Sequence, residues 1–327
     1  MNRGARRAGS SGHDSRDHTA AGARHHELRH PGRRGHLVRA ARPLRRARRR
    51  LARHRRCLRV LERPGRGARS ERVLGAWLAA RPGVREQVRI STKTGVRGGL
   101  GAAAVRTAAR GSLDRLGVGS VDLFWAHVED RRTDLDETVA ALGALVTDGL
   151  AARLGASNHA SWRVERARAA AAAQGVAAFD AVQYRHSYVL PRPGAALPDS
   201  GHMLLDAGAA DLAATEGLTL WAYTPLVNGA LTRTDRALPD AYDHPGTTAR
   251  LAALDAVAAD TGATRNQVVL AWIMTGGHGR TGLAGELAVG PAWPLVGVSR
   301  TAQLDEALDA RDLHLTEEHR AVLDGAA

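Results

Sequence analysis

Short apolar runs alternate with longer amphipathic stretches from Ser70 onward, and this alternation is the strongest constraint on the fold. The apolar runs predict strands at residues 88–93, 121–127, 152–158, 179–184, 218–223 and 294–299. Helical periodicity covers residues 101–116, 134–149, 161–173, 204–215, 248–259, 264–274, 301–310 and 316–325. Strands that alternate with helices require a parallel sheet, so the sequence predicts an α/β fold.

Two details refine this prediction. A further helix begins near Ser70, which is a polar capping residue, and Trp162 is expected to anchor the helix 161–173 in the core. Polar residues follow the predicted strands, as they do in barrel enzymes. We therefore predict a TIM barrel, (β/α)8, over residues 70–327, preceded by a separate arginine-rich segment at residues 1–69.

The residues at the carboxyl ends of the predicted strands carry most of the candidate chemistry. They are Lys93, His127, Ser157, Asn158, Gln183, Tyr223, Ser299 and Arg300. Individually, His127 is consistent with a buried core histidine, Asn158 with a cap of the helix near Ser161, and Tyr223 with simple packing. A parallel barrel brings all of these strand ends to one rim, which favours a single ligand site.

Lys93 is the only lysine in a chain that uses arginine for every other basic side chain. A guanidinium is planar and always protonated, whereas a lysine ammonium is compact and can tune the acidity of a neighbouring hydroxyl. Lys93 ends a predicted strand, where barrel enzymes hold their catalytic groups. We predict a catalytic role; the alternative is a solvated surface lysine.

The net charge of +14 is concentrated in the first part of the chain. Residues 1–70 contain 22 arginines and four acidic residues, a net charge of +18, whereas the remainder contains 25 basic and 29 acidic residues, a net charge of −4. Cys57 is the single cysteine, which excludes a disulfide framework and favours a reducing, cytoplasmic location. No apolar run reaches the length of about 18 residues that a membrane span needs.

Residues 1–70 contain no Phe, Trp, Tyr, Lys or Ile, but seven of the 15 histidines. Arginine-rich arms bind nucleic acid, because they release counterions from phosphates, so a basic arm is one interpretation. A targeting peptide needs an apolar core or an amphipathic helix, and neither is evident. The third interpretation is a GC-rich coding sequence translated in the wrong frame. Shifting the frame by one base over residues 51–62 permits a string with aromatic residues and ordinary loop patterns, which favours this third interpretation.

Several linked motifs make residues 70–325 resemble the aldo-keto reductase family. They are Ser70-Glu71 with Leu74-Gly75, Ser91-Thr92-Lys93, Val121-Asp122-Leu123 followed by His127 and Asp130, Gly155-Ala156-Ser157-Asn158, Val182-Gln183, the stretch Tyr223 to Leu231, and the stretch Gly297 to Glu306. The resemblance implies an eight-stranded barrel that reduces an aldehyde or ketone, a small-molecule substrate, with NADPH (NADP as the cofactor).

The resemblance also implies individual roles. Lys93 and His127 match two members of the catalytic tetrad of Asp, Tyr, Lys and His. The cofactor-binding positions are Ser157, Asn158 and Gln183 for the nicotinamide carboxamide, Tyr223 for the nicotinamide ring, Pro225, Leu226 and Gly229 for the pyrophosphate, and Gly297, Ser299, Arg300, Gln303 and Glu306 for the adenosine end. Arg300 corresponds to a ligand of the 2′-phosphate. We assign no metal site.

The sequence departs from the family pattern where the catalytic aspartate and tyrosine belong. The resemblance places them in residues 51–60, which contain neither residue type as written. In the shifted frame the aspartate spans the codons of Arg53 and His54, and the tyrosine spans those of Leu58 and Arg59. The barrel is then incomplete as written, because its first two strands and first helix are replaced, and activity is impaired. The competing interpretation is an inactive barrel with a basic arm that binds nucleic acid.

Overall fold

The computed structural model describes residues 66–95, 98–196, 202–276 and 289–326. Within these residues the chain forms one parallel sheet, whose strand order follows the chain order. The strands are β1 (Ser91–Thr94), β2 (Leu123–Ala126), β3 (Leu154–Ser157), β4 (Phe179–Arg185), β5 (Thr219–Tyr223) and β6 (Trp293–Leu295). In the described part of the chain β1 and β6 are the two edges, so the predicted parallel sheet is confirmed as a curled, incomplete (β/α)8 barrel.

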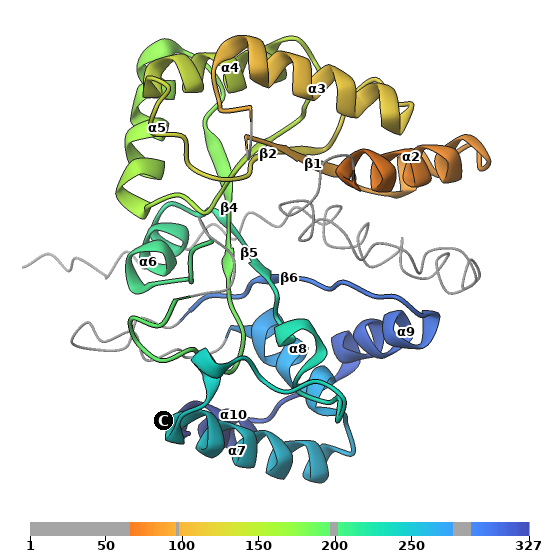
Figure 1. Cartoon of the computed structure of the whole chain (residues 1–327), viewed down its shortest axis with the longest axis vertical. Helices are drawn as coiled ribbons and strands as arrows, with labels where there is room; N and C mark the ends of the chain where they lie inside the picture. Colours follow the sequence, from red (N-terminus) through yellow and green to blue (C-terminus); the bar gives the residue numbers. More distant parts are fainter. Residues whose placement is uncertain (1–65, 96–97, 197–201, 277–288, 327) are drawn as a thin grey trace, which may run out of the picture.

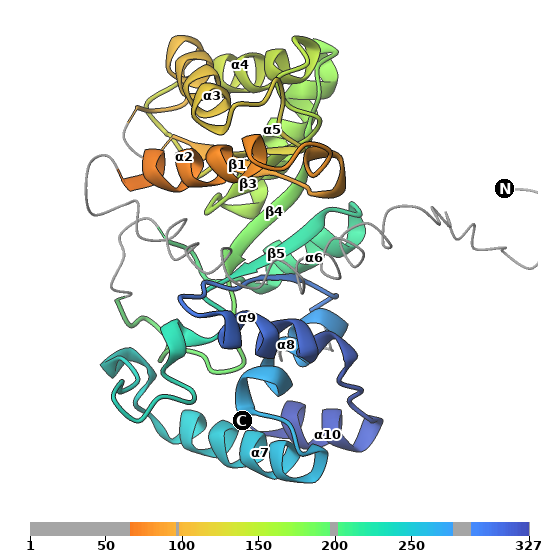
Figure 2. The same ribbon diagram turned by 90° about the vertical axis from the view of Figure 1, so that its right-hand side faces the viewer.

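Helices cover the outer side of the curled sheet (Figure 1). The α-helices are α2 (Arg66–Ala79), α3 (Ala102–Leu116), α4 (Leu135–Thr147), α5 (Ser161–Gln174), α6 (Ala207–Thr215), α7 (Pro245–Thr261), α8 (Arg265–Thr275), α9 (Thr301–Asp309) and α10 (Glu317–Gly325). Short 3-10 turns are η1 (Arg85–Gln87), η2 (Val227–Gly229), η3 (Asp240–Tyr242) and η4 (Ala310–Asp312). Figures 1 and 2 show α3, α4 and α5 gathered at one end of the molecule and α7, α8 and α10 at the other.

Local signals in the sequence set several helix ends. Helix α4 begins after Asp134, whose carboxylate accepts a hydrogen bond from the N–H of Asp136 at 2.8 Å. Helix α8 begins with a reciprocal cap between Thr264 and Gln267. Helix α3 ends at Gly117, whose φ of 65° is the left-handed conformation that glycine adopts without strain. These caps satisfy backbone groups that have no partner within the helix.

Helix α2 is fastened to the rest of the fold by one carboxylate and one glycine. The Glu71 carboxylate accepts hydrogen bonds from Thr92 Oγ1 at 2.5 Å and from Arg115 Nε at 2.7 Å. A Cβ atom at Gly75 would lie 2.5 Å from the carbonyl oxygen of Arg115, so only glycine allows this approach to α3. The helix begins at Arg66, four residues before the predicted start at Ser70.

The inside of the sheet is lined by large aromatic side chains. Trp125 packs with Leu123 and Ala181 and meets Trp221 edge to face, with 5.8 Å between ring centroids. A Cβ atom at Gly155 would lie 2.3 Å from the Trp125 ring, so the absence of a side chain there makes room for the indole. The larger apolar core lies between the sheet and the surrounding helices.

One element-level prediction is wrong. Trp162 does not anchor α5, because its side chain is 52% exposed. Helix α5 buries the smaller residues Val164, Ala167 and Ala171 in its place. A guanidinium, that of Arg131, lies 5.9 Å from the centroid of the Trp162 ring.

Several interpretations concern residues outside the described part of the chain. The basic arm and the shifted frame both refer almost entirely to residues 1–65, which include the positions 51–60 of the expected aspartate and tyrosine. None of the helices in the described ranges combines the length and the apolar character needed to cross a membrane.

Candidate active site

The predicted strand-end residues lie on one side of the sheet, where the strands have their carboxyl ends. Lys93 is on β1, Ser157 ends β3, Gln183 is on β4 and Tyr223 ends β5. His127 follows β2 directly, and its N–H donates to the Thr94 carbonyl at 2.8 Å. Because every strand is parallel to the next, their carboxyl ends share this side.

Lys93 points into the site and contacts one predicted residue, Gln183, and one that was not predicted, Trp125. Its ammonium donates a hydrogen bond to Gln183 Oε1 and lies 5.7 Å from the centroid of the Trp125 ring. The side chain is half-buried between these groups. Lys93 is therefore not the solvated surface lysine of the alternative interpretation.

His127 is a buried, neutral imidazole. Burial, followed by the positive charge of Lys93 and the proximity of His202, lowers the pKa of His127 to about 3. Near neutral pH the ring therefore carries a single N–H, which can donate one hydrogen bond to a ligand oxygen. A neutral imidazole can orient a carbonyl group by a hydrogen bond without transferring its proton.

Asn158 connects four parts of the site. Its Nδ2 donates to the carbonyl oxygen of His127 and to Ser157 Oγ, each at 3.1 Å. Its Oδ1 accepts hydrogen bonds from Met203 N at 2.9 Å and from the Tyr223 hydroxyl at 2.7 Å. The alternative of a cap for α5 is wrong, because Ala160 occupies the capping position. The backbone of Asn158 has a φ of 57°, in the left-handed region that asparagine tolerates better than most residues.

A segment that the sequence did not reveal completes this part of the site. Two backbone hydrogen bonds join Met203 and Leu205 to Arg185. The Arg185 N–H donates to the Met203 carbonyl, and the Leu205 N–H donates to the Arg185 carbonyl, each at 2.9 Å. The segment therefore extends the sheet beside the end of β4. It also places the ring of His202 edge-on to Tyr223, with centroids 5.3 Å apart.

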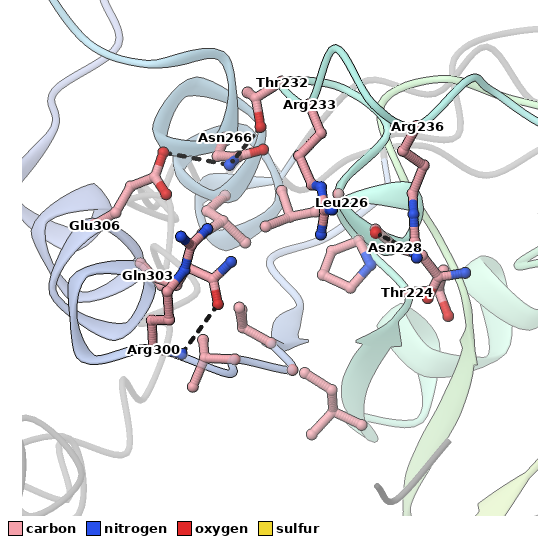
Figure 3. Close-up of a pocket in the computed structure, with 18 residues that line it drawn as sticks. Thr224, Leu226, Asn228, Thr232, Arg233, Arg236, Asn266, Arg300, Gln303 and Glu306 are labelled. Carbon is pink, nitrogen blue, oxygen red and sulfur yellow. Dashed lines mark hydrogen bonds between the residues drawn. The ribbon is translucent and has the colours of Figure 1, made fainter. Parts of the chain in front are cut away.

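A cavity of about 330 Å³ lies beyond β5 and β6. The predicted residues that line it are Pro225, Leu226, Gly229, Gly297, Arg300, Gln303 and Glu306. Figure 3 shows Arg300, Gln303 and Glu306 on one side of this cavity and Arg233 and Arg236 on the other. The last two, with Asn266, were missed by the sequence analysis, because arginines in a loop carry no distinctive pattern.

The loop that follows β5 has a strained backbone. Thr224, Val227 and Asn228 have φ values of 55°, 45° and 57°. The left-handed region is costly for β-branched residues, and such conformations collect at ligand-binding sites. Arg236 Nη1 donates to the Asn228 carbonyl at 2.8 Å and so braces the turn.

The opposite wall is organised by two side chains of α9. Gln303 Oε1 accepts hydrogen bonds from the backbone N–H of Ser299 at 2.8 Å and from that of Arg300 at 3.3 Å. Glu306 Oε1 accepts hydrogen bonds from Thr264 Oγ1 at 2.7 Å and from Asn266 Nδ2 at 3.2 Å. Gln303 therefore shapes the turn that carries Arg300, and Glu306 joins α9 to α8.

A second cavity, of about 370 Å³, lies at the other end of the site. Its lining includes Gly95, Val128 and Asn158, which follow β1, β2 and β3, and His202, from the segment beside the end of β4. Asp130 also borders it. Burial alone would raise the pKa of Asp130, but hydrogen bonds from Thr133 and from the backbone lower it to about 2, so the carboxylate is charged near neutral pH.

Comparisons with known proteins agree with this geometry. The Aldo/keto reductase family model matches residues 66–327. The chain is 31% identical over 275 residues to aldo-keto reductase str7 of Strobilurus tenacellus, covering 78% of this chain and 72% of the relative. It is 27% identical over 252 residues to a 6-dehydroglucose reductase of Novosphingobium aromaticivorans, covering 74% and 69%.

A solved structure supports the fold independently. It is a crystal structure of a thermostable aldo-keto reductase in complex with the inhibitor epalrestat. The TM-score is 0.59 at 23% sequence identity, and the match covers 80% of this chain and 78% of that chain. The family match, the relatives and the parallel curled sheet all lead to one assignment: this chain belongs to the aldo/keto reductase family, whose members are oxidoreductases that act on carbonyl compounds.

Proposed function

We propose that this chain is built to reduce an aldehyde or ketone to an alcohol with NADPH. The observation that carries the proposal is a continuous row of polar side chains at the carboxyl ends of the strands. Lys93, Gln183 and His127 form its central part, and the cavity bordered by Arg300 lies at the β6 end. A dinucleotide needs such an extended site, with a polar amide pocket at one end and a cation at the other.

The residues present fit a nicotinamide and a phosphate. Gln183 is fully buried, and its Nε2 makes no hydrogen bond to any described residue. A buried amide N–H without an acceptor is costly, and a carboxamide oxygen would supply that acceptor. Arg300 precedes the first turn of α9, where a guanidinium and backbone N–H groups together favour an anion. When bound, NADPH supplies the hydride that the carbonyl carbon receives.

The remaining chemistry would be carried out by this chain's side chains. His127 would donate its single N–H to the carbonyl oxygen and orient it. Lys93 would hold a positive charge beside the group that protonates this oxygen and lower its pKa toward the working pH. We propose Ser157 and Tyr223 as further contacts of the nicotinamide, with Asn158 between them.

We also propose that the chain as written is impaired. The tyrosine that would protonate the alkoxide and the aspartate that would position Lys93 belong to residues 51–60, which contain neither. Loss of a general acid typically lowers the rate by about 10²- to 10⁴-fold. The shifted reading frame would restore both residues, and the nucleotide sequence upstream of Ser70 tests this part of the proposal.

Cofactor binding by the full chain tests the proposed function. NADPH should quench tryptophan fluorescence, and Arg300→Ala should weaken NADPH binding by about 1.5 to 3 kcal/mol, because one charge-assisted contact to the 2′-phosphate is lost. NADH lacks this phosphate, so its affinity should hardly change. Arg311→Ala, at an exposed residue outside the cavity, is the matched control. Equal losses for both cofactors would assign Arg300 a structural role.

The competing proposal is an inactive barrel with a nucleic-acid-binding arm, favoured by the 22 arginines before Glu71. It predicts retention on DNA that weakens as salt rises and disappears when residues 1–65 are removed. Retention without NADPH binding would favour the arm over the reductase.

A further inference from the structure

The mouth of the second cavity presents cations to solvent and keeps its carboxylates inside. The side chains of Arg131 and Arg132 are 66% and 86% exposed, whereas those of Glu129 and Asp130 are 9% and 6% exposed. All four residues line the cavity. A ligand that approaches from solvent therefore meets guanidinium groups before it meets any acidic oxygen.

The buried carboxylates are already engaged within the protein. Glu129 accepts hydrogen bonds from Arg131 Nε at 2.5 Å and from the Ala160 N–H at 3.2 Å, and it forms an ion pair with Arg163 at 3.1 Å. Asp130 accepts hydrogen bonds from the loop around it, and Arg132 Nε lies 3.8 Å from its Oδ1, at the outer limit of an ion pair. Arg132 is thus the less neutralised of the two exposed cations.

An aromatic surface adjoins these cations. Trp162 is 52% exposed, and its indole packs against Arg131, which itself borders the cavity. Among the exposed large apolar side chains in the described part of the chain, Trp162 is the most exposed, so its ring is open to a ligand. A guanidinium and an indole side by side offer a planar anion one charged partner and one stacking partner.

The cavity lies next to the proposed reaction centre. Gly95 is two residues beyond Lys93, Val128 follows His127 directly, and both line the cavity. A carbonyl compound whose oxygen reaches His127 can place the rest of its molecule in this cavity, which Arg131 and Arg132 also line.

We infer that the preferred substrates are aromatic carbonyl compounds that carry an anionic group, with the anion bound at Arg132 and Arg131 and the ring against Trp162. The carbonyl part of this inference rests on the proposed function. The binding of the anionic ring does not, because it requires neither a cofactor nor catalysis.

Calorimetric titration of the full chain with 4-acetylbenzoate and with its neutral methyl ester tests the inference. The two ligands share the ketone and the ring and differ in one charge. We expect the acid to bind about tenfold more tightly, the effect of one charge-assisted contact. Arg132→Gln should remove most of this preference, and added salt should weaken the acid alone. Arg110→Gln, an exposed arginine of α3 that lines neither cavity, should leave the preference intact.

Trp162→Ala should weaken both ligands, whereas Trp162→Phe should retain most of the affinity because it keeps an aromatic face. Equal binding of acid and ester would overturn the inference, as would a preference that survives the combined replacement Arg131→Gln and Arg132→Gln. NADPH titration of the same preparations separates the two proposals. Normal NADPH binding without a charge preference refutes only the anionic substrate class, whereas a charge preference without NADPH binding refutes only the proposed function.

Discussion

The positive charge of Lys93 affects the pKa of His127, and this effect can be measured on the His127 ring. Replacing Lys93→Met removes a cation that disfavours the imidazolium, so the pKa of His127 should rise from about 3. It should remain below the ordinary value of 6.5, because burial is the larger cause. NMR titration of the His127 ring measures the shift. Arg89→Gln, at a residue whose partner is Asp122, is the control, and an unchanged His127 pKa in Lys93→Met would disprove the coupling.

Gly155 is required by the shape of the Trp125 ring. An added methyl would lie 2.3 Å from the indole, which is itself wedged against Trp221. Overpacking of this kind costs about 1 to 3 kcal/mol, so Gly155→Ala should lower the free energy of unfolding by that amount. Urea unfolding measures the loss. Gly119→Ala, where a Cβ meets no atom within 4 Å, should change stability little, and equal effects of both substitutions would contradict the packing argument.

At the scale of elements, α2 depends on one carboxylate. Glu71→Gln removes the charge that Arg115 and Thr92 share, so α2 should loosen from α3 and β1. We expect a loss of about 1 to 2 kcal/mol in the free energy of unfolding, less than for a fully buried pair because Arg115 is partly exposed. Glu165→Gln should cost less, because the Glu165 side chain is 51% exposed and its partner Arg168 keeps a second carboxylate, that of Glu216. Equal unfolding midpoints for the two variants would show that α2 is not held in this way.

The sequence predicted the elements well because strands and helices each have a periodicity that burial imposes. At the start of the first strand, a side chain takes the place of a backbone partner. The first strand was predicted from Val88, but the N–H of Ile90 donates to Asp122 Oδ2, and regular pairing begins only at Ser91. The predicted strand 294–299 is observed as β6, which ends at Leu295.

The residues of the site were predictable at strand ends and in the motif after β5, where Pro225, Leu226 and Gly229 line the first cavity, but not in the other loops. Lys93 and Gln183 follow from their positions on strands, and their contact needs no further information. The segment around Met203 could not be found, because its only distinguishing feature is pairing with Arg185, which is a tertiary contact. The prediction that Trp162 is buried was wrong for a physical reason. Apolar residues are buried on average, but the sequence does not show which of them are exposed. The functional roles themselves stay predictions.

For the whole molecule, buried neutral histidines predict sensitivity to acid. Burial lowers the pKa of His127 to about 3 and that of His186 to about 4, and it lowers the pKa of His159 as well. Between pH 6.5 and about 4 the unfolded chain therefore binds protons that the folded chain does not. Stability should fall as pH decreases through this window, by about 1.4 kcal/mol per pH unit for each such proton.

Urea unfolding at pH 7, 6 and 5 measures this loss. The double variant His127→Gln and His186→Gln should show a shallower dependence on pH, because two of the three groups are removed. His314→Gln, at an exposed residue, should keep the dependence of the parent chain. A stability that does not change from pH 7 to pH 5 would mean that these histidines are not neutral in the folded state.

Strand order that follows chain order also has a kinetic meaning. Each strand pairs with its neighbour in chain order, so most paired segments are close together in the chain; the exception is β5 with β6, between which α7 and α8 are inserted. Parallel pairing closes a loop through a helix and is slow to form, but successive units can dock in order as they leave the ribosome. Damage at the start of the gene would remove the neighbour of β1 and, in a closed barrel, that of β6, but it would leave the pairing of β2 to β5 in place.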